Sequence, residues 1–112
     1  MTSPLPDLID RLFVATNAFD VESALALFAP DAAIDDLSVG GRFAGLAGVR
    51  SYIKQFFVGY ATVTRIVSLE MEGDCRAIVH LDVKGYFGHE TSAMRISVDP
   101  NGLITAIDAN VA

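Results

Sequence analysis

The chain contains one cysteine, few basic residues and no long apolar run. Because Cys75 stands alone, it has no disulfide partner and no second thiolate for a metal, and we expect a buried, inert thiol. The 8 lysines and arginines are scattered singly among 14 acidic residues, which argues against nucleic acid as a partner. No segment approaches the roughly 20 apolar residues that span a bilayer, so no membrane partner is expected.

At 112 residues, the length suits one domain, and no repeat, linker or low-complexity tract divides it. We therefore expect a single domain over residues 1–112. The N-terminal letters MTSPLPDLIDR lack a basic region followed by an apolar stretch, so no secretion signal is expected and the predicted location is cytoplasmic. The sequence has no GxSxG motif, phosphate-binding loop or dinucleotide fingerprint, and we expect neither a cofactor nor a metal.

The first half of the sequence has helical periodicity. Apolar residues recur every three or four positions after Ser3 and Pro4, which suit a helix cap and a first turn. Asp20 is suited to cap a second, short helix, and Pro30 to end it. These signals predict helices over residues 5–19, 20–28 and 46–60, with a short hairpin of strands over 32–39 and 42–44 between the last two.

The second half of the sequence is rich in β-branched residues separated by short turns, which predicts strands over residues 62–71, 75–83, 87–98 and 103–109. Taking Lys84 and Gly85 as a two-residue turn places Val79 opposite Glu90, and makes His80 and His89 direct cross-strand neighbours. Three helices against one face of a strongly curved, mostly antiparallel sheet predict an α+β fold, a cone-shaped barrel that encloses a pocket.

The outer face of this sheet is predicted to be mixed in character, because alternation places the following residues there: Ile78, His80, Asp82, Ala93, Ile104 and Ala106. A partly apolar outer face suits another sheet, so we expect a homodimer through it. The two histidines with Asp82 could hold a metal at such a contact. Two nitrogens make only half of a tetrahedral zinc site, however, so polar pairing is favoured.

Two adjacent acids, Asp35 and Asp36, follow an apolar run. Side chains alternate along a strand, so Ile34 and Asp36 share one face and Asp35 lies on the other. Ile34 should belong to the core, which places Asp36 toward the pocket and Asp35 toward solvent. Loss of hydration makes a carboxylate a better acceptor for a proton on carbon. The alternative is that Asp36 only binds a backbone group or lies at a wet cavity mouth.

The opening half of the chain resembles the nuclear transport factor 2-like superfamily, which includes ketosteroid isomerases and SnoaL-like polyketide cyclases. The resemblance lies in Asn17–Asp20, Ala24–Phe28, Asp31 with Ala32, Asp36 and Gly45, and the later strand order fits the same cone-shaped fold. It implies that Asp36 stands where ketosteroid isomerases have their general base.

The same resemblance places apolar residues where those isomerases have other polar groups. Leu12 and Met94 occupy the two positions where those isomerases have their oxyanion donors. Ile53, next to Tyr52, occupies the position of a supporting tyrosine. Because lost oxyanion donors cost a few kcal/mol each, roughly, steroid isomerisation by the familiar mechanism is not expected.

Three functions stay open. One is an isomerase, cyclase or dehydratase-like enzyme in which Asp36 removes a proton alpha to a carbonyl. Another is a module that binds a small apolar molecule without chemistry, and the third is a dimeric interaction protein with a vestigial cavity. Besides Asp36 as catalytic residue, the residues expected to bind the ligand are Leu12, Phe13, Thr16, Tyr52, Ile53, Tyr60, Glu90, Ser92, Met94, Ile96, Ile107 and Ala109.

Overall fold

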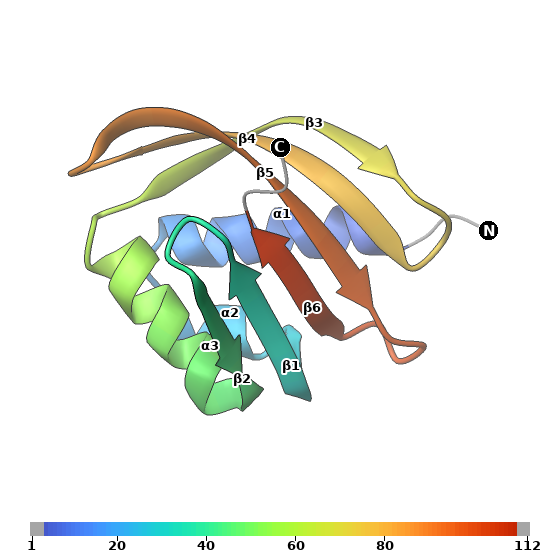
Figure 1. The fold of residues 1–112 in the computed structure, drawn as a ribbon. Helices are drawn as coiled ribbons and strands as arrows, with labels where there is room; N and C mark the ends of the chain where they lie inside the picture. Colours follow the sequence, from blue (N-terminus) through green and yellow to red (C-terminus); the bar gives the residue numbers. More distant parts are fainter. Residues whose placement is uncertain (1–3, 110–112) are drawn as a thin grey trace.

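The computed structural model of the protein describes residues 4–109, which form helices packed against one six-stranded sheet (Figure 1). The helices are α1 (Leu5–Asn17), α2 (Val21–Leu25), α3 (Gly45–Ile53) and the π-helix η1 (Lys54–Val58). The strands are β1 (Phe28–Asp36), β2 (Gly41–Ala44), β3 (Val63–Met71), β4 (Arg76–Gly85), β5 (Gly88–Val98) and β6 (Ile104–Ala109). The predicted α+β class, with helices on a curved and mostly antiparallel sheet, is confirmed. Ser3, predicted to cap the first helix, lies outside the described residues.

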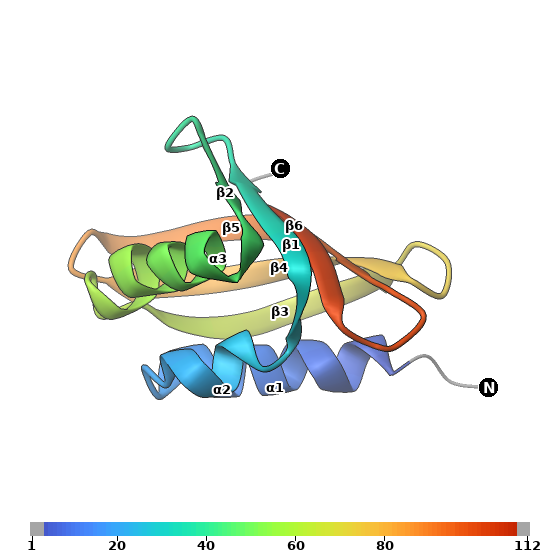
Figure 2. The same cartoon turned by 90° about the horizontal axis from the view of Figure 1, so that it is seen from below.

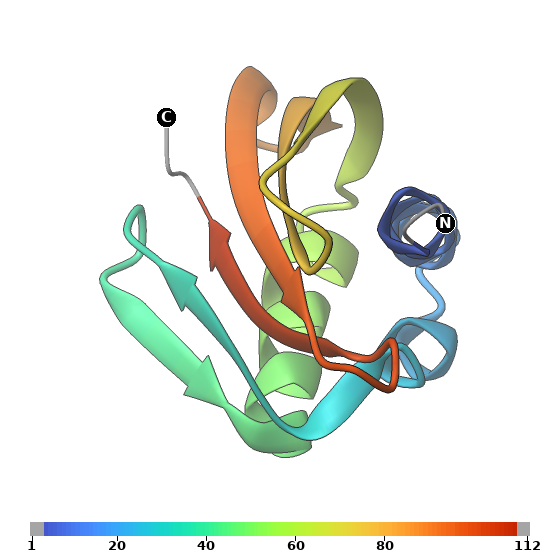
Figure 3. The ribbon, with the colours of Figure 1, turned by 90° about the vertical axis from the view of Figure 1, so that its right-hand side faces the viewer.

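The sheet has the strand order β2-β1-β6-β5-β4-β3, and only the β1–β6 pair is parallel. Viewed along α1, the sheet curls around the inner side where α1 and α3 lie (Figure 3). Helix α1 runs alongside β3 (Figure 2). The Asn17 amide donates to the Thr64 carbonyl at 2.8 Å and accepts from the Thr64 N–H at 2.7 Å, which fixes the end of α1 to that strand.

Strand β1 begins and ends earlier than predicted, at Phe28 and Asp36 instead of residues 32 and 39. The second helix correspondingly ends at Leu25 instead of Phe28. The Leu27 carbonyl accepts from the Ile104 N–H at 2.9 Å, and Phe28 pairs with Ile104. Pairing with β6 therefore extends the strand into residues for which local pattern favours helix.

The predicted third helix changes its winding before it ends. After Ile53 the backbone continues as η1, in which the Gly59 N–H donates to the Lys54 carbonyl at 2.8 Å, five residues back. Gly59 fits this turn because a Cβ there would lie 2.6 Å from the Gln55 carbonyl oxygen. The Thr62 hydroxyl donates to the Phe56 carbonyl at 2.6 Å and closes the end of η1. Single π-helical turns of this kind are frequent at functional sites.

The predicted register of the β4–β5 hairpin is wrong. The turn lies at Tyr86 and Phe87, and Gly85 pairs with Gly88, so Val79 faces Met94 and Val83 faces Glu90. Gly85 lies instead against Tyr60, just after η1: a Cβ on Gly85 would be 2.7 Å from the Tyr60 carbonyl oxygen, which accepts from the Tyr86 N–H. The predicted register of this hairpin differs from the observed one by four residues. Because four is an even number, the side chains of β4 and β5 keep their predicted faces of the sheet.

Two further predictions are wrong. Ile104, expected on the outer face, is fully buried because the β5–β6 ladder slips by one residue between Ser97 and Val98. Cys75, expected to be buried, is exposed in the turn before β4. Within residues 4–109, no helix is long and apolar enough to cross a membrane.

Candidate functional site

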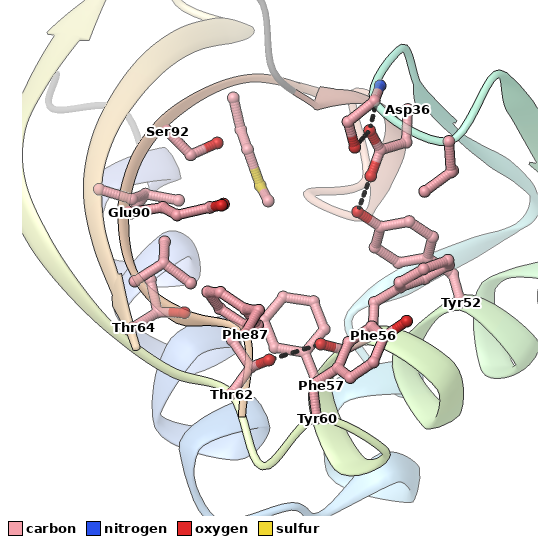
Figure 4. Close-up of a pocket in the computed structure, with 15 residues that line it drawn as sticks. Asp36, Tyr52, Phe56, Phe57, Tyr60, Thr62, Thr64, Phe87, Glu90 and Ser92 are labelled. Carbon is pink, nitrogen blue, oxygen red and sulfur yellow. Dashed lines mark hydrogen bonds between the residues drawn. The ribbon is translucent and has the colours of Figure 1, made fainter. Parts of the chain in front are cut away.

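A cavity of about 270 Å³ opens between the inner face of the sheet and the helical segment α3–η1 (Figure 4). Its wall is mainly apolar and aromatic, with a few polar side chains. The lining residues are Asp36, Ser38, Val39, Tyr52, Phe56, Phe57, Tyr60, Thr62, Thr64, Leu81, Val83, Phe87, Glu90, Ser92 and Met94. A concave, mostly apolar space with a few polar groups is the usual form of a small-molecule site.

Asp36 ends strand β1 at this wall and is 5% exposed. Its Oδ1 accepts from the Ser38 N–H at 2.9 Å and from the Ser38 hydroxyl at 2.6 Å. Its Oδ2 accepts from the Tyr52 hydroxyl at 2.5 Å. These donors stabilise a carboxylate inside the protein and fix its orientation.

The neighbouring acid lies on the opposite side of the strand. The Asp35 carboxylate forms an ion pair with Arg42 at 3.1 Å, and both side chains are partly exposed. Alternation along β1 thus turns Asp36 toward the cavity and Asp35 toward solvent.

Tyr52 reaches the carboxylate from the inner face of α3 and is itself buried. Burial raises the pKa of the Tyr52 phenol well above its ordinary value, and the hydrogen bond to Asp36 and the charge of that carboxylate raise the pKa further. The phenol is therefore protonated at every ordinary pH and acts as a hydrogen-bond donor. Its ring packs against Phe43 and Phe56, with centroids 5.1 and 4.8 Å away.

A second polar pair lies on the opposite wall of the cavity. Glu90 and Ser92 project from β5 toward the space that Asp36 and Tyr52 face from the other side (Figure 4). Glu90 is exposed, near the β4–β5 turn that carries Phe87. The cavity therefore has a buried polar group at one wall and an open carboxylate at the other, with rings and aliphatic side chains between them.

The structure divides the predicted site residues into three groups. The cavity is lined by Asp36, Tyr52, Tyr60, Glu90, Ser92 and Met94. A separate closed hollow of about 20 Å³ is lined by Leu12, Phe13, Thr16, Ile53 and Ile107, together with Tyr52 and Met94. Ile96 and Ala109 line neither space and belong to the core. The Thr16 hydroxyl donates to the Phe13 carbonyl at 3.3 Å within α1.

Sequence reasoning missed much of the aromatic side of the cavity. The predicted site omitted the cavity residues Ser38, Val39, Phe56, Phe57, Thr62, Thr64, Leu81, Val83 and Phe87. Two signals were available for some of them. Phe56 and Phe57 lie on the helical face that carries Tyr52, and Leu81 and Val83 share the inward parity of Val79.

The histidines lie on the outer face, but they are not the direct neighbours that were predicted. His80 pairs with Ala93 across the strands, and His89 pairs with Lys84. The His89 ring nitrogen bonds to Asp82 and lowers the pKa of that carboxyl, while His80 lies 3.4 Å from Glu70. No group of three or more His, Cys, Asp or Glu side chains within residues 4–109 could hold a metal ion.

Comparison with known proteins gives one matching family and many similar structures. The model of the family described as "SnoaL-like domain" matches residues 9–106. A protein from Sinorhizobium meliloti named as a polyketide cyclase is 24% identical, with a TM-score of 0.84, and the match covers 93% of this chain and 94% of that one. A search of curated proteins finds no match.

Two other similar structures differ in what they bind or do. A Mycobacterium tuberculosis protein in complex with estradiol-17β-hemisuccinate is 18% identical, with a TM-score of 0.86, over 99% of this chain and 95% of that one. An epoxide hydrolase/cyclase-like enzyme of pyran ring formation in the polyether salinomycin is 16% identical, with a TM-score of 0.82, over 93% and 87%. At these identities the structural matches establish the shared fold only.

Proposed function

The chain belongs to the SnoaL-like domain family of the nuclear transport factor 2-like superfamily, and on that premise we propose that its cavity binds a small, mainly apolar molecule. One polar end of this molecule would lie against Asp36 and Tyr52. The observation that carries the proposal is an open, largely apolar cavity with a buried aspartate–tyrosine pair in its wall.

The cavity volume limits the size of the ligand. A space of about 270 Å³ lies just below the usual range of ligand pockets, about 300–1,000 Å³. One water takes about 30 Å³ in the liquid, so the space suits an organic molecule on the order of ten to fifteen non-hydrogen atoms. A larger ligand would extend through the mouth, past the exposed rings of Tyr60 and Phe87.

Binding is tested with benzylacetone and phenylpropanol, two neutral probes of this size, followed by NMR chemical shifts. Binding should shift the signals of Phe57, Val83 and Met94, which line the cavity, and leave those of Asp99 and Asn101 in the distant β5–β6 turn unchanged. Native mass spectrometry of freshly purified protein would show a ligand carried from the cell. Shifts spread over the whole surface, or none at all, would contradict the proposal.

A second candidate function is acid–base catalysis at the same wall. Asp36 would remove a proton alpha to a ligand carbonyl, and the C–H electrons would form an enolate. Once Asp36 is protonated, its negative charge no longer holds the Tyr52 hydroxyl, which can then donate to the enolate oxygen. If the ligand has a β,γ double bond, the enolate is a dienolate, and return of the proton to its γ carbon completes an isomerisation. If the enolate carbon instead attacks a second carbonyl carbon of the ligand, the C=O π bond breaks, a ring closes and the new alkoxide takes the proton from Asp36. The buried carboxylate beside a phenol hydroxyl, both in the cavity wall, favours this candidate.

Catalysis is tested by deuterium exchange at the alpha carbons of benzylacetone in D₂O, without knowledge of the natural substrate. We expect Asp36→Asn to slow the exchange about a thousandfold, because a positioned base contributes roughly 10²–10⁴ in rate. The asparagine variant should still bind the probe. Equal exchange rates in the two proteins would refute the role of Asp36 as a base and leave the binding function intact.

A homodimer through the outer sheet face, and a cytoplasmic location, stay predictions. The outer face combines small side chains, such as the cross-strand neighbours Ala33 and Ala106, with a charged row in which Asp108 of β6 lies between Asp35 of β1 and Arg95 of β5. Light scattering after size exclusion at micromolar concentration should give twice the 12.0 kDa mass of the chain. A monomer mass would contradict the dimer and, with it, the alternative function as a dimeric interaction protein.

A further inference from the structure

The charges that face the cavity are all negative. Two of its lining residues, Asp36 and Glu90, are acids, and none of the lining residues is a lysine, arginine or histidine. Of the nearby basic groups, Arg42 forms an ion pair with Asp35 on the other side of β1, and Lys84 lies on the outer face with its partner His89. A ligand that enters the cavity therefore meets two carboxylates without a compensating cation.

Glu90 differs from the other acid in having no polar partner among the residues that the structure describes. Asp36 accepts hydrogen bonds from Ser38 and Tyr52, whereas no hydrogen bond or ion pair joins Glu90 to any of residues 4–109. Its side chain projects toward the cavity from the wall opposite Asp36 (Figure 4). An acid that only served solubility would do so equally well on the outer face of β5.

Aromatic rings surround the same end of the cavity. Phe87, three residues before Glu90, and Tyr60 meet edge to face with centroids 6.1 Å apart, and Phe56 continues the row toward Tyr52. The faces of aromatic rings attract cations, most strongly where water is excluded. A free carboxylate beside several rings is the combination that recognises an ammonium group with an apolar body.

We propose that the ligand of this cavity is a small amine, with its ammonium group between Glu90 and the rings of Tyr60 and Phe87, and with the rest of the molecule extending past Met94 toward the wall that carries Asp36 and Tyr52. This inference rests on the proposed binding function and narrows it to one chemical class. Carboxylates and phosphates are excluded as ligands, because they would add a third negative charge to the same space. The net charge of −6 also favours the approach of a cation.

The test uses three probes with one skeleton: phenylpropylamine, phenylpropanol and phenylpropanoate. Isothermal titration at low salt should show the amine binding about tenfold tighter than the alcohol, and the acid about tenfold weaker, because only the charge differs. Added salt at about 0.5 M should reduce the advantage of the amine, since screening acts on the exposed Glu90.

The matched variants are Glu90→Gln and Glu70→Gln, which remove the same charge from the cavity and from the outer edge of β3. We expect Glu90→Gln to weaken amine binding about tenfold and to leave alcohol binding within about twofold. Glu70→Gln should change neither by more than about twofold, which separates the local effect from that of net charge.

The outcomes distinguish the two proposals. If the alcohol binds as tightly as the amine, or if Glu90→Gln leaves the preference for the amine unchanged, the assignment to amines is overturned while the cavity keeps its binding function. If none of the three probes binds in the cavity, the binding function itself fails. Circular dichroism of Glu90→Gln would verify its fold, which we expect to be unaffected because Glu90 is exposed.

Discussion

The open cavity and the closed hollow share one wall, yet one is open to solvent and the other is enclosed by packed side chains. Tyr52, Phe57 and Met94 line both spaces. In the hollow, Leu12 and Ile107 are at most 4% exposed and surround about 20 Å³, room for about one water. In the cavity, Tyr60 and Phe87 are 45% and 41% exposed. Apolar side chains of the hollow thus hold the fold together, while those of the cavity are left for a ligand to cover.

The largest change in the free energy of unfolding is expected for a substitution of Leu12 in the hollow. Leu12→Ala should lower the free energy of unfolding by about 3 kcal/mol, because it enlarges a closed and well-packed space that cannot collapse fully. Urea denaturation followed by circular dichroism measures the loss. The matched change in the open cavity, Phe87→Ala, should cost about 1 kcal/mol or less, while weakening the binding of benzylacetone. If Phe87→Ala proved the more destabilising of the two, the division between the spaces would be wrong.

A smaller effect is expected at the shared wall, in Tyr52→Phe. This change removes the hydroxyl that donates to Asp36 and leaves a buried carboxylate with one donor fewer, at a cost of about 2 kcal/mol in unfolding free energy. The same denaturation measurement applies. Tyr60→Phe is the control, since no hydrogen bond from its hydroxyl is seen within residues 4–109, and it should change stability by less than about 0.5 kcal/mol. Equal losses in both variants would mean that the bond to Asp36 adds nothing.

The pH dependence of the free energy of unfolding gives a second test of the buried Tyr52 phenol. Its pKa is higher in the folded protein than the ordinary value of 10.0, so the folded state keeps a proton that the unfolded chain loses above that pH. Stability from this group is complete below pH 10 and is lost as the pH rises. From pH 9 to 11 the wild type should lose about 1 kcal/mol more than Tyr52→Phe does. Urea midpoints at the two pH values measure this difference. Parallel losses would contradict the assignment.

The smallest effect concerns the turn at the cavity mouth between η1 and β3. Ala61 has φ of 52°, a left-handed conformation that glycine adopts without steric cost. Ala61→Gly should therefore raise the free energy of unfolding by about 0.5 kcal/mol, since relief of strain exceeds the extra backbone entropy. Ala26→Gly, at an exposed position with φ of −61°, should lower it by a similar amount. Thermal unfolding of both variants tests the contrast, and destabilisation by both would show that Ala61 is not strained.

The sequence predicted the layers and the faces of the strands well, because these depend on local periodicity. Ile34 and Asp36 share the inner face of β1, and Ala77, Val79 and Leu81 are buried along β4, as alternation requires. Periodicity carries no information about which turn closes a hairpin. The observed turn places Gly85 against the Tyr60 carbonyl, which also accepts from the Tyr86 N–H, and these contacts join segments that are distant in the sequence.

The site was harder to predict than the fold. Asp36 and Tyr52 belong to different elements, so their spacing in the sequence does not predict that their side chains form a hydrogen bond. Likewise, the single-residue slip in the β5–β6 ladder places Ile104 in the core instead of on the predicted outer face. Apolar residues such as Leu12 and Phe13 show the same sequence pattern whether they line a cavity or fill a core. Only packing in three dimensions separates them.

The parallel pairing of β1 with β6 joins two segments that are far apart in the chain. Asp36 stands on an early strand, yet its ladder partner is Ala109, about two thirds of the chain length away. During synthesis, the aspartate and tyrosine can emerge from the ribosome long before the strand that holds β1 in place exists. Without β6, one edge of β1 lacks the partner strand that it has in the folded protein, and an unpaired edge of this kind can pair with other polypeptides.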